Sequence, residues 1–163
     1  MSTDPKHIRN VVLLGHSHCG KTSMIEAMLY ESKAITRRGT VEAGNTVSDF
    51  SDIEQERRGS LFSKLMHVNW KESKINIVDT PGSDDFVGEI LSSMKVSDLG
   101  IMVLNAAHGV EVGTELIWEY KEKFQLPGMF VINQCDHEKA DFDSTLEQAI
   151  SRFGPKLIPF QYP

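Results

Sequence analysis

Apolar residues along the chain alternate between two spacings. A continuous apolar run, typical of a strand that is buried on both faces, occupies residues 11–14, and further strands are expected at 74–79, 99–104 and 128–133. Between them, apolar residues recur at helical spacing in 21–31, in the stretch after Phe86 and in 114–124. A capping-box pattern at 144–147 predicts one more helix, running to about Arg152. Residues 61–70 alternate as a half-buried strand does, and 156–160 are expected to form a last strand.

One segment breaks this alternation. Residues 33–60 are rich in polar residues and contain almost no periodic apolar positions. A structureless stretch of that length is uncommon inside a domain and is usually a functional or mobile loop. We therefore expect it to be such a loop.

Strands that alternate with helices favour parallel pairing with right-handed crossovers. The predicted fold class is therefore α/β: a P-loop NTPase three-layer sandwich, with a mostly parallel sheet and helices on both faces. Ligand loops are expected at the carboxyl ends of the strands. The segments between strands and helices are accordingly the place to search for chemistry.

Composition adds limits to this picture. A chain of 163 residues, 40% hydrophobic and 25% charged, fits one globular domain. It contains no apolar run of membrane-spanning length and begins with a polar stretch, so a cytoplasmic protein is expected, with no membrane contact. The net charge of -6 provides no general surface for DNA, and a monomer is expected. Cys19 and Cys135 both fall in candidate site loops, and we interpret them as free thiols.

The strongest motif runs from Gly15 to Thr22, which matches G-x-x-x-x-G-K-[ST] between a predicted strand and a predicted helix. Its glycines let backbone NH groups surround phosphate oxygens, and the start of the helix adds a positive end. Lys21 would neutralise the β and γ phosphates, and Thr22 would offer its hydroxyl to Mg²⁺. The same loop contains His16, His18 and Cys19, for which a metal site is the alternative interpretation, although no second ligand pair lies nearby in sequence.

Two further motifs follow in the order that a guanine-nucleotide site requires. Asp79-Thr80-Pro81-Gly82 ends a strand, so its carboxylate could act near Mg²⁺ and its glycine near the γ-phosphate; a simple strand-ending turn is the alternative. Asn133-Gln134-Cys135-Asp136 follows another strand. A carboxylate at Asp136 would accept guanine N1-H and N2-H, whereas adenine would leave that charge unpaired. A polar turn is again the alternative interpretation.

With these motifs the chain resembles the first, GTP-binding domain of translation elongation factor G over nearly its whole length, and most closely the divergent second-type paralogues. The supporting stretches are GHSHCGKT, EQERRG, KINIVDTPG, DFVGEI, GVEVGTELIW and NQCD. The resemblance implies a translational GTPase that converts GTP to GDP and phosphate, with Mg²⁺ as cofactor and the ribosome as partner. It also implies an incomplete domain spanning 1–163, which lacks the S-A-[LK] loop that contacts guanine and all downstream domains.

Motifs and resemblance together define the expected site. The residues expected to contact GTP or GDP are Gly15, His16, Ser17, His18, Cys19, Gly20, Lys21, Thr22, Ser23, Asp79, Gly82, Asn133, Gln134 and Asp136. For Mg²⁺ the expected residues are Thr22, Asp79 through a water molecule, and Ser60 as a lesser candidate.

Several positions depart from the family pattern. The family's water-positioning His is Ser83 here, which is expected to cap the next helix rather than to catalyse. The Thr that completes the family's Mg²⁺ shell is Leu61, which cannot act as a ligand, whereas Ser60 could if the register shifts by one residue. Gln134 replaces the lysine whose stem packs over the base, and His18 replaces an acidic residue of the phosphate loop. The hypothesis is therefore a GTP-binding switch with slow or impaired hydrolysis and weakened guanine binding.

Two alternatives stay open. GTP could order residues 36–60 for docking to the ribosome without any hydrolysis. A P-loop kinase or ATPase is the third class, and Asp136 argues against it.

Overall fold

The computed structural model describes residues 4–163 and contains one five-stranded sheet with the strand order β2-β3-β1-β4-β5. Its strands are β1 (Ile8–Leu14), β2 (Lys64–Trp70), β3 (Ser73–Asp79), β4 (Leu99–Asn105) and β5 (Gly128–Asn133). Four of them are parallel, and only the β2–β3 pairing is antiparallel, with Lys64 opposite Asp79. The predicted mostly parallel α/β sandwich is confirmed.

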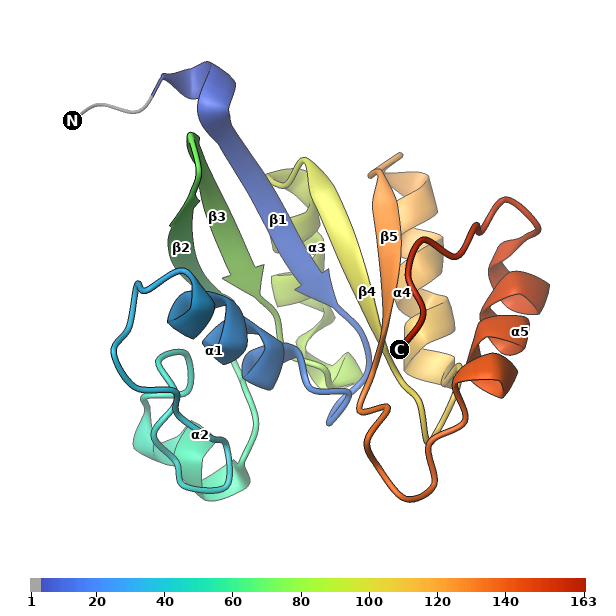
Figure 1. The fold of residues 1–163 in the computed structure, drawn as a ribbon, viewed down its shortest axis with the longest axis horizontal. Helices are drawn as coiled ribbons and strands as arrows, with labels where there is room; N and C mark the ends of the chain where they lie inside the picture. Colours follow the sequence, from blue (N-terminus) through green and yellow to red (C-terminus); the bar gives the residue numbers. More distant parts are fainter. Residues whose placement is uncertain (1–3) are drawn as a thin grey trace.

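Helices cover both faces of this sheet. The α-helices are α1 (Lys21–Glu31), α2 (Asp52–Arg57), α3 (Val87–Lys95), α4 (Val112–Lys123) and α5 (Phe142–Phe153), and short 3-10 turns η1 (Pro5–His7) and η2 (Asp84–Phe86) precede β1 and α3. Figure 1 shows α1 in front of the sheet, α3 and α4 behind it, and α5 beside β5. Within residues 4–163, no helix has the length and apolar character needed to cross a membrane.

Strand β1 explains why the sheet separates two apolar layers. Val11 and Leu13 point into the cluster beneath α1, whereas Val12 and Leu14 point into the cluster beneath α3 and α4. All four are buried, because successive side chains of a strand face opposite sides. The carboxyl ends of β1, β3, β4 and β5 therefore meet at one edge of a sheet that is covered on both faces, at the lower side of Figure 1.

Three expectations about secondary structure were wrong. Residues 156–160 form no strand, because Pro159 has no NH to donate to a ladder. The last helix begins at Phe142 and is capped by Asp141, whose Oδ1 accepts from Ser144 N at 2.9 Å, instead of opening at Ser144. The polar segment is not structureless either, since it contains α2.

Helix α2 has a local cause that the sequence did carry. Ser51 accepts a hydrogen bond from Glu54 N and donates its own hydroxyl proton to the Glu54 carboxylate at 2.7 Å. The residues follow the S-x-x-E pattern of a capping box, although the Glu54 carboxylate accepts from the Ser51 hydroxyl and not from the Ser51 backbone NH. Attention to residues 51–54 would have predicted the helix.

Candidate functional site

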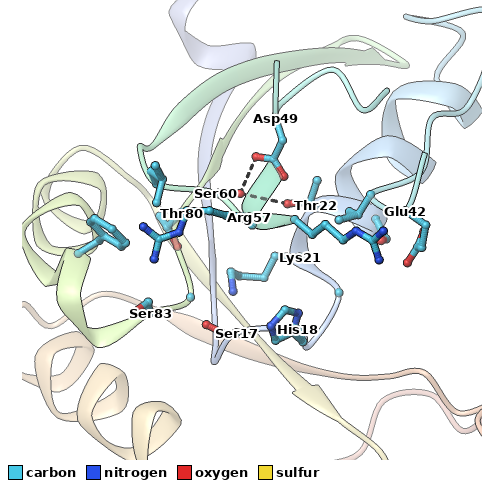
Figure 2. A pocket seen from close by; sticks show the side chains of 18 of the residues that line it. Ser17, His18, Lys21, Thr22, Glu42, Asp49, Arg57, Ser60, Thr80 and Ser83 are labelled. Atoms are coloured by element: carbon cyan, nitrogen blue, oxygen red, sulfur yellow. Dashed lines mark hydrogen bonds between the residues drawn. The ribbon is translucent and has the colours of Figure 1, made fainter. Parts of the chain in front are cut away.

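A polar cavity of about 530 Å³ lies at the carboxyl edge of the sheet. Its walls come from the phosphate-loop motif, the segment that contains α2, and the turn after β3. Figure 2 shows Lys21 in the middle of this cavity, with Ser17, His18 and Ser83 on one side and Thr22, Ser60 and Asp49 on the other. The size is in the range of small-ligand sites.

The loop between β1 and α1 has the backbone that a phosphate cradle needs. Gly15 and Gly20 have φ values of 139° and 92°, which favour glycine. A Cβ on Gly15 would lie 2.4 Å from the Val103 carbonyl oxygen, and one on Gly20 would lie 2.3 Å from Asn133 Nδ2. Both glycines are therefore fixed by neighbouring strands as well as by their own conformation.

Lys21 is held inside this loop. Its side chain is buried, and Nζ donates to the carbonyl oxygens of Gly15 at 2.8 Å and His16 at 3.0 Å. Gly82 approaches so closely that a Cβ there would lie 2.6 Å from Lys21 Nζ and 2.7 Å from Ser17 N. The third proton of the ammonium group faces Cys19 Sγ at 3.9 Å, a long bond to a weak acceptor that a phosphate oxygen can replace. The loop and the turn after β3 thus form one unit.

Oxygen atoms suited to a hard cation gather beside Lys21. Thr22 Oγ1 donates to Asp79 Oδ2 at 2.9 Å and lies 3.4 Å from Ser60 Oγ. Asp79 is fully buried, and its Oδ1 finds no hydrogen-bond partner among residues 4–163. Burial raises the pKa of the Asp79 carboxyl, and the nearby charge of Asp49 adds to the shift, while Thr22 and Lys21 oppose it. An orphaned carboxylate oxygen beside two hydroxyls fits Mg²⁺.

Asp49 is a site residue that the sequence analysis missed. Its side chain is 4% exposed. Oδ1 accepts from Ser60 Oγ at 2.8 Å and from Lys64 Nζ at 3.3 Å. Oδ2 is buried and has no hydrogen-bond partner in the described part of the chain. One Asp within a polar loop gives no periodic or motif signal, so only the folded segment reveals it.

The Lys64 ammonium is shared with Glu54. Glu54 is 1% exposed and accepts from Lys64 Nζ, from Leu61 N at 2.9 Å and from Ser51 Oγ. Burial acts to raise the pKa of Glu54, but these hydrogen bonds outweigh it and the pKa is lowered. The 49–64 segment is therefore tied together by buried charge.

Ser83 follows Gly82 and starts the η2 turn. Its Oγ accepts from Asp85 N at 3.4 Å and donates to Asp85 Oδ2 at 3.2 Å, which is the geometry of an N-cap. The same residue lines the cavity. The expected capping geometry is present.

The motif after β5 lies against the phosphate loop. Asn133 Nδ2 donates to the Cys19 carbonyl at 2.9 Å, and Gln134 Nε2 donates to the His18 carbonyl at 3.0 Å. Asn105, a second residue missed from sequence, donates to Gln134 Oε1 at 2.7 Å. Asp136 is exposed on the following turn. The structure thus brings the two motifs, 114 positions apart in sequence, into direct contact.

Two side chains of the phosphate loop face away from the cavity. His16 packs on the start of α4, with Nε2 3.6 Å from Glu111 Oε1, and Cys19 is 1% exposed within the apolar cluster. Burial raises the pKa of the Cys19 thiol. Across residues 4–163, no group of three His, Cys, Asp or Glu side chains is arranged for a metal ion. Both cysteines are free thiols, as expected.

Comparison with known proteins gives a consistent set of relatives. The family described as elongation factor Tu GTP binding domain matches residues 6–160. The mitochondrial ribosome-releasing factor 2 of Anopheles gambiae is 39% identical over 97% of this chain and 21% of its own length. The elongation factor G-like protein of Mycobacterium tuberculosis is 36% identical over 98% of this chain and 22% of its own length.

A solved structure agrees with these matches. A crystal structure of a protein from Thermus thermophilus superposes with a TM-score of 0.88 at 36% identity, covering 91% of this chain and 22% of that one. The chain thus spans about a fifth of the length of the relatives it matches.

Proposed function

The chain belongs to the elongation factor Tu GTP binding domain family, and from that premise we propose that it is the GTP-binding domain of an elongation factor G-like ribosomal translocation factor whose hydrolysis of GTP is impaired. The single observation that supports nucleotide binding most directly is the convergence of Lys21, Thr22 and Asp79 at the carboxyl edge of the sheet. The ribosome is the proposed partner of the whole factor.

The proposed binding mode follows from the contacts around the cavity. Backbone NH groups between Gly15 and Thr22 would hold the phosphates of GTP or GDP, together with the Lys21 Nζ proton that faces the weak acceptor Cys19 Sγ. Asp136 would accept the two guanine protons, while Asn133 holds the base-binding turn against the phosphate loop. Gln134 fixes the same turn through its amide, so it offers the base less apolar cover than a lysine stem would.

The proposed cation site uses oxygen ligands only. Thr22 would bind Mg²⁺ directly, and Asp79 would bind it through a water molecule. Ser60 Oγ lies 3.4 Å from Thr22 Oγ1 and donates to Asp49, so Ser60 is the lesser candidate ligand. When bound, Mg²⁺ neutralises phosphate charge and orients the phosphate oxygens. Leu61 stands where the family has a Thr that binds Mg²⁺, and its side chain has no oxygen, so the neighbouring Ser60 would have to supply that ligand.

Impaired hydrolysis is proposed from two positions. Ser83 uses its hydroxyl in the N-cap of η2, and a hydroxyl cannot supply the imidazole of the family pattern. Leu61 likewise lacks the hydroxyl with which the family's Thr binds Mg²⁺, so this ligand would have to come from Ser60. Both changes affect groups that would act on the attacking water or on the charge that develops in the transition state.

Single-turnover release of γ-phosphate tests this proposal. The full-length factor should bind GTP with Mg²⁺ yet release phosphate far more slowly than translational GTPases do, both with and without ribosomes. Ser83→His should raise the rate by about 10-fold or more, as a positioned general base contributes about 10²–10⁴-fold. A wild-type rate typical of elongation factors would refute the impairment. An unchanged rate in Ser83→His would mean that another group limits hydrolysis.

The second candidate is a GTP-gated module that binds the ribosome and never hydrolyses GTP. The capping bond of Ser83 favours it, since the only side chain at the family's water-positioning place is already engaged. Ribosome binding that depends on GTP over GDP, without measurable phosphate release over many binding lifetimes, would select this candidate over slow hydrolysis.

A further inference from the structure

Glu26 is a buried carboxylate in the middle of α1 that the proposed binding mode does not use. Its side chain is 1% exposed, although Glu is almost never buried without a partner. Its partners are two backbone NH groups from one loop. Oε2 accepts from Gly39 N at 2.9 Å, and Oε1 accepts from Val47 N.

The loop between these two amides is compact. Thr40 N donates to Asn45 Oδ1 at 2.8 Å, and Gly44 N donates to the Val41 carbonyl at 3.1 Å. Gly39 lies so close to Asn45 that a Cβ would be 2.3 Å from the Asn45 carbonyl oxygen. Both ends of segment 39–47 are therefore fastened to one carboxylate, and the middle turns back on itself.

This segment forms part of the nucleotide cavity. Val41 and Glu42 line this cavity, and Figure 2 shows Glu42 on the side of Thr22. At its other end, Thr46 Oγ1 accepts from Asp49 N at 3.3 Å, and Asp49 in turn accepts from Ser60 beside Thr22. Hydrogen bonds, joined by short stretches of chain, thus connect the middle of α1 through the segment to the first turn of the same helix.

We propose that Glu26 is a positioning residue that fastens segment 39–47 to α1, so that order in this wall and occupation of the phosphate loop are coupled. A buried carboxylate that loses two charge-assisted hydrogen bonds is strongly disfavoured, so the segment and the carboxylate must stay together or leave together. The coupling to nucleotide rests on the proposed function, whereas the fastening itself does not.

The chain offers a direct readout of this fastening. Arg37 and Arg38 are exposed immediately before Gly39, so trypsin can report how often the segment opens. Glu26→Gln presents an NH₂ group to one of the two amide donors and should speed cleavage there at least fivefold. Glu31→Gln is the matched control, because Glu31 lies on the same helix and is exposed.

A spectroscopic measurement separates this role from a general loss of stability. In the free protein, the amide proton signals of Gly39 and Val47 should lie downfield, and Glu26→Gln should move both while signals of 99–105 stay in place. Glu26→Met removes the acceptors but keeps an apolar side chain suited to a buried helix position, so the fold survives and the same two signals should move. Unchanged signals and unchanged cleavage in both variants would overturn the fastening.

Addition of GTP and Mg²⁺ then tests the coupling. Cleavage at Arg37 and Arg38 should slow in the wild-type protein and slow less in Glu26→Met. Equal protection in the two proteins would overturn the coupling even though the fastening holds. Absence of GTP binding to the wild-type protein would instead refute the proposed function, and the measurements on the free protein would still decide the role of Glu26.

Discussion

Lys21 and Asp136 mark the two ends of the proposed nucleotide site, and their surroundings differ. Lys21 is 7% exposed and donates to two carbonyl oxygens inside a loop clamped by Gly82, whereas Asp136 is exposed on a turn. The phosphate end is shaped by the packing of β1, α1 and the turn after β3. The base end is held by amides that reach back to the phosphate loop. We infer that the phosphate end sets affinity and the base end sets selectivity.

Removal of the Lys21 side chain should cause the largest loss of nucleotide affinity. Lys21→Ala should weaken GTP and GDP binding about 100-fold, because one hydrogen bond between charged groups contributes about 1.5–3 kcal/mol and the positive charge beside the phosphates is lost with it. The preference for GTP over ITP should stay the same. Titration calorimetry measures both quantities, with exposed Lys33→Ala as the control. A loss below about fivefold would contradict the assignment of affinity to the phosphate end.

The opposite pattern is expected at the base end. Asp136→Ala should weaken GTP binding about 30-fold, because both guanine protons lose their acceptor, and the preference for GTP over ITP should vanish. Competition of GTP, ITP and ATP against a fluorescent guanine nucleotide measures this. Asp143→Ala removes an exposed carboxylate elsewhere and serves as the control. Retained selectivity in Asp136→Ala would assign the reading of the base to another group.

A substitution at Gln134 tests whether the missing lysine stem weakens contact with the guanine base. Gln134→Lys should tighten GTP and GDP binding about fivefold, because a lysine stem adds apolar contact with the base of the order of 1 kcal/mol. Gln125→Lys is the control, since Gln125 also has a positive φ, 54° against 59° for Gln134. Weaker nucleotide binding in Gln134→Lys would show that the bond from Asn105 matters more than the apolar contact.

The smallest effect concerns stability. Burial raises the pKa of the Asp79 carboxyl in the folded protein, so the charge costs stability once the pH exceeds the ordinary pKa of 3.8 that the group has in the unfolded chain. Asp79→Asn should therefore stabilise the protein in EDTA at neutral pH by about 1 kcal/mol, and this gain should shrink as the pH falls toward that value. Urea unfolding measures it, with Asp143→Asn as the control. A destabilised Asp79→Asn protein would mean that the unpaired amide costs more than the buried charge.

Elements with regular periodicity could be predicted from the sequence, and those built by tertiary contacts could not. The bounds of α1 and β5 match the apolar spacing, and the phosphate loop follows from its motif. Asp49 and Glu26 gave no signal, because a carboxylate becomes informative only when its burial and partners are known. The strand expected at 156–160 failed because apolar composition alone does not supply an NH at Pro159.

Ser83 was predictable in its structural role but not in its effect on hydrolysis. The motif and the resemblance placed it after Gly82, and local capping chemistry predicted its hydrogen bond to the following turn. Its meaning for hydrolysis depends on a nucleotide and an attacking water, which neither the sequence nor the fold contains. The rate measurement on Ser83→His therefore carries information that no contact in the protein supplies.

The different burial of the two thiols makes the protein convenient for optical work. Cys135 is exposed between Gln134 and Asp136, whereas Cys19 is 1% exposed and burial raises its pKa. A maleimide dye reacts with the thiolate, so it should attach at Cys135 while Cys19 stays unmodified without mutagenesis. The dye would sit one residue from the proposed guanine acceptor, where its emission can follow nucleotide exchange in real time.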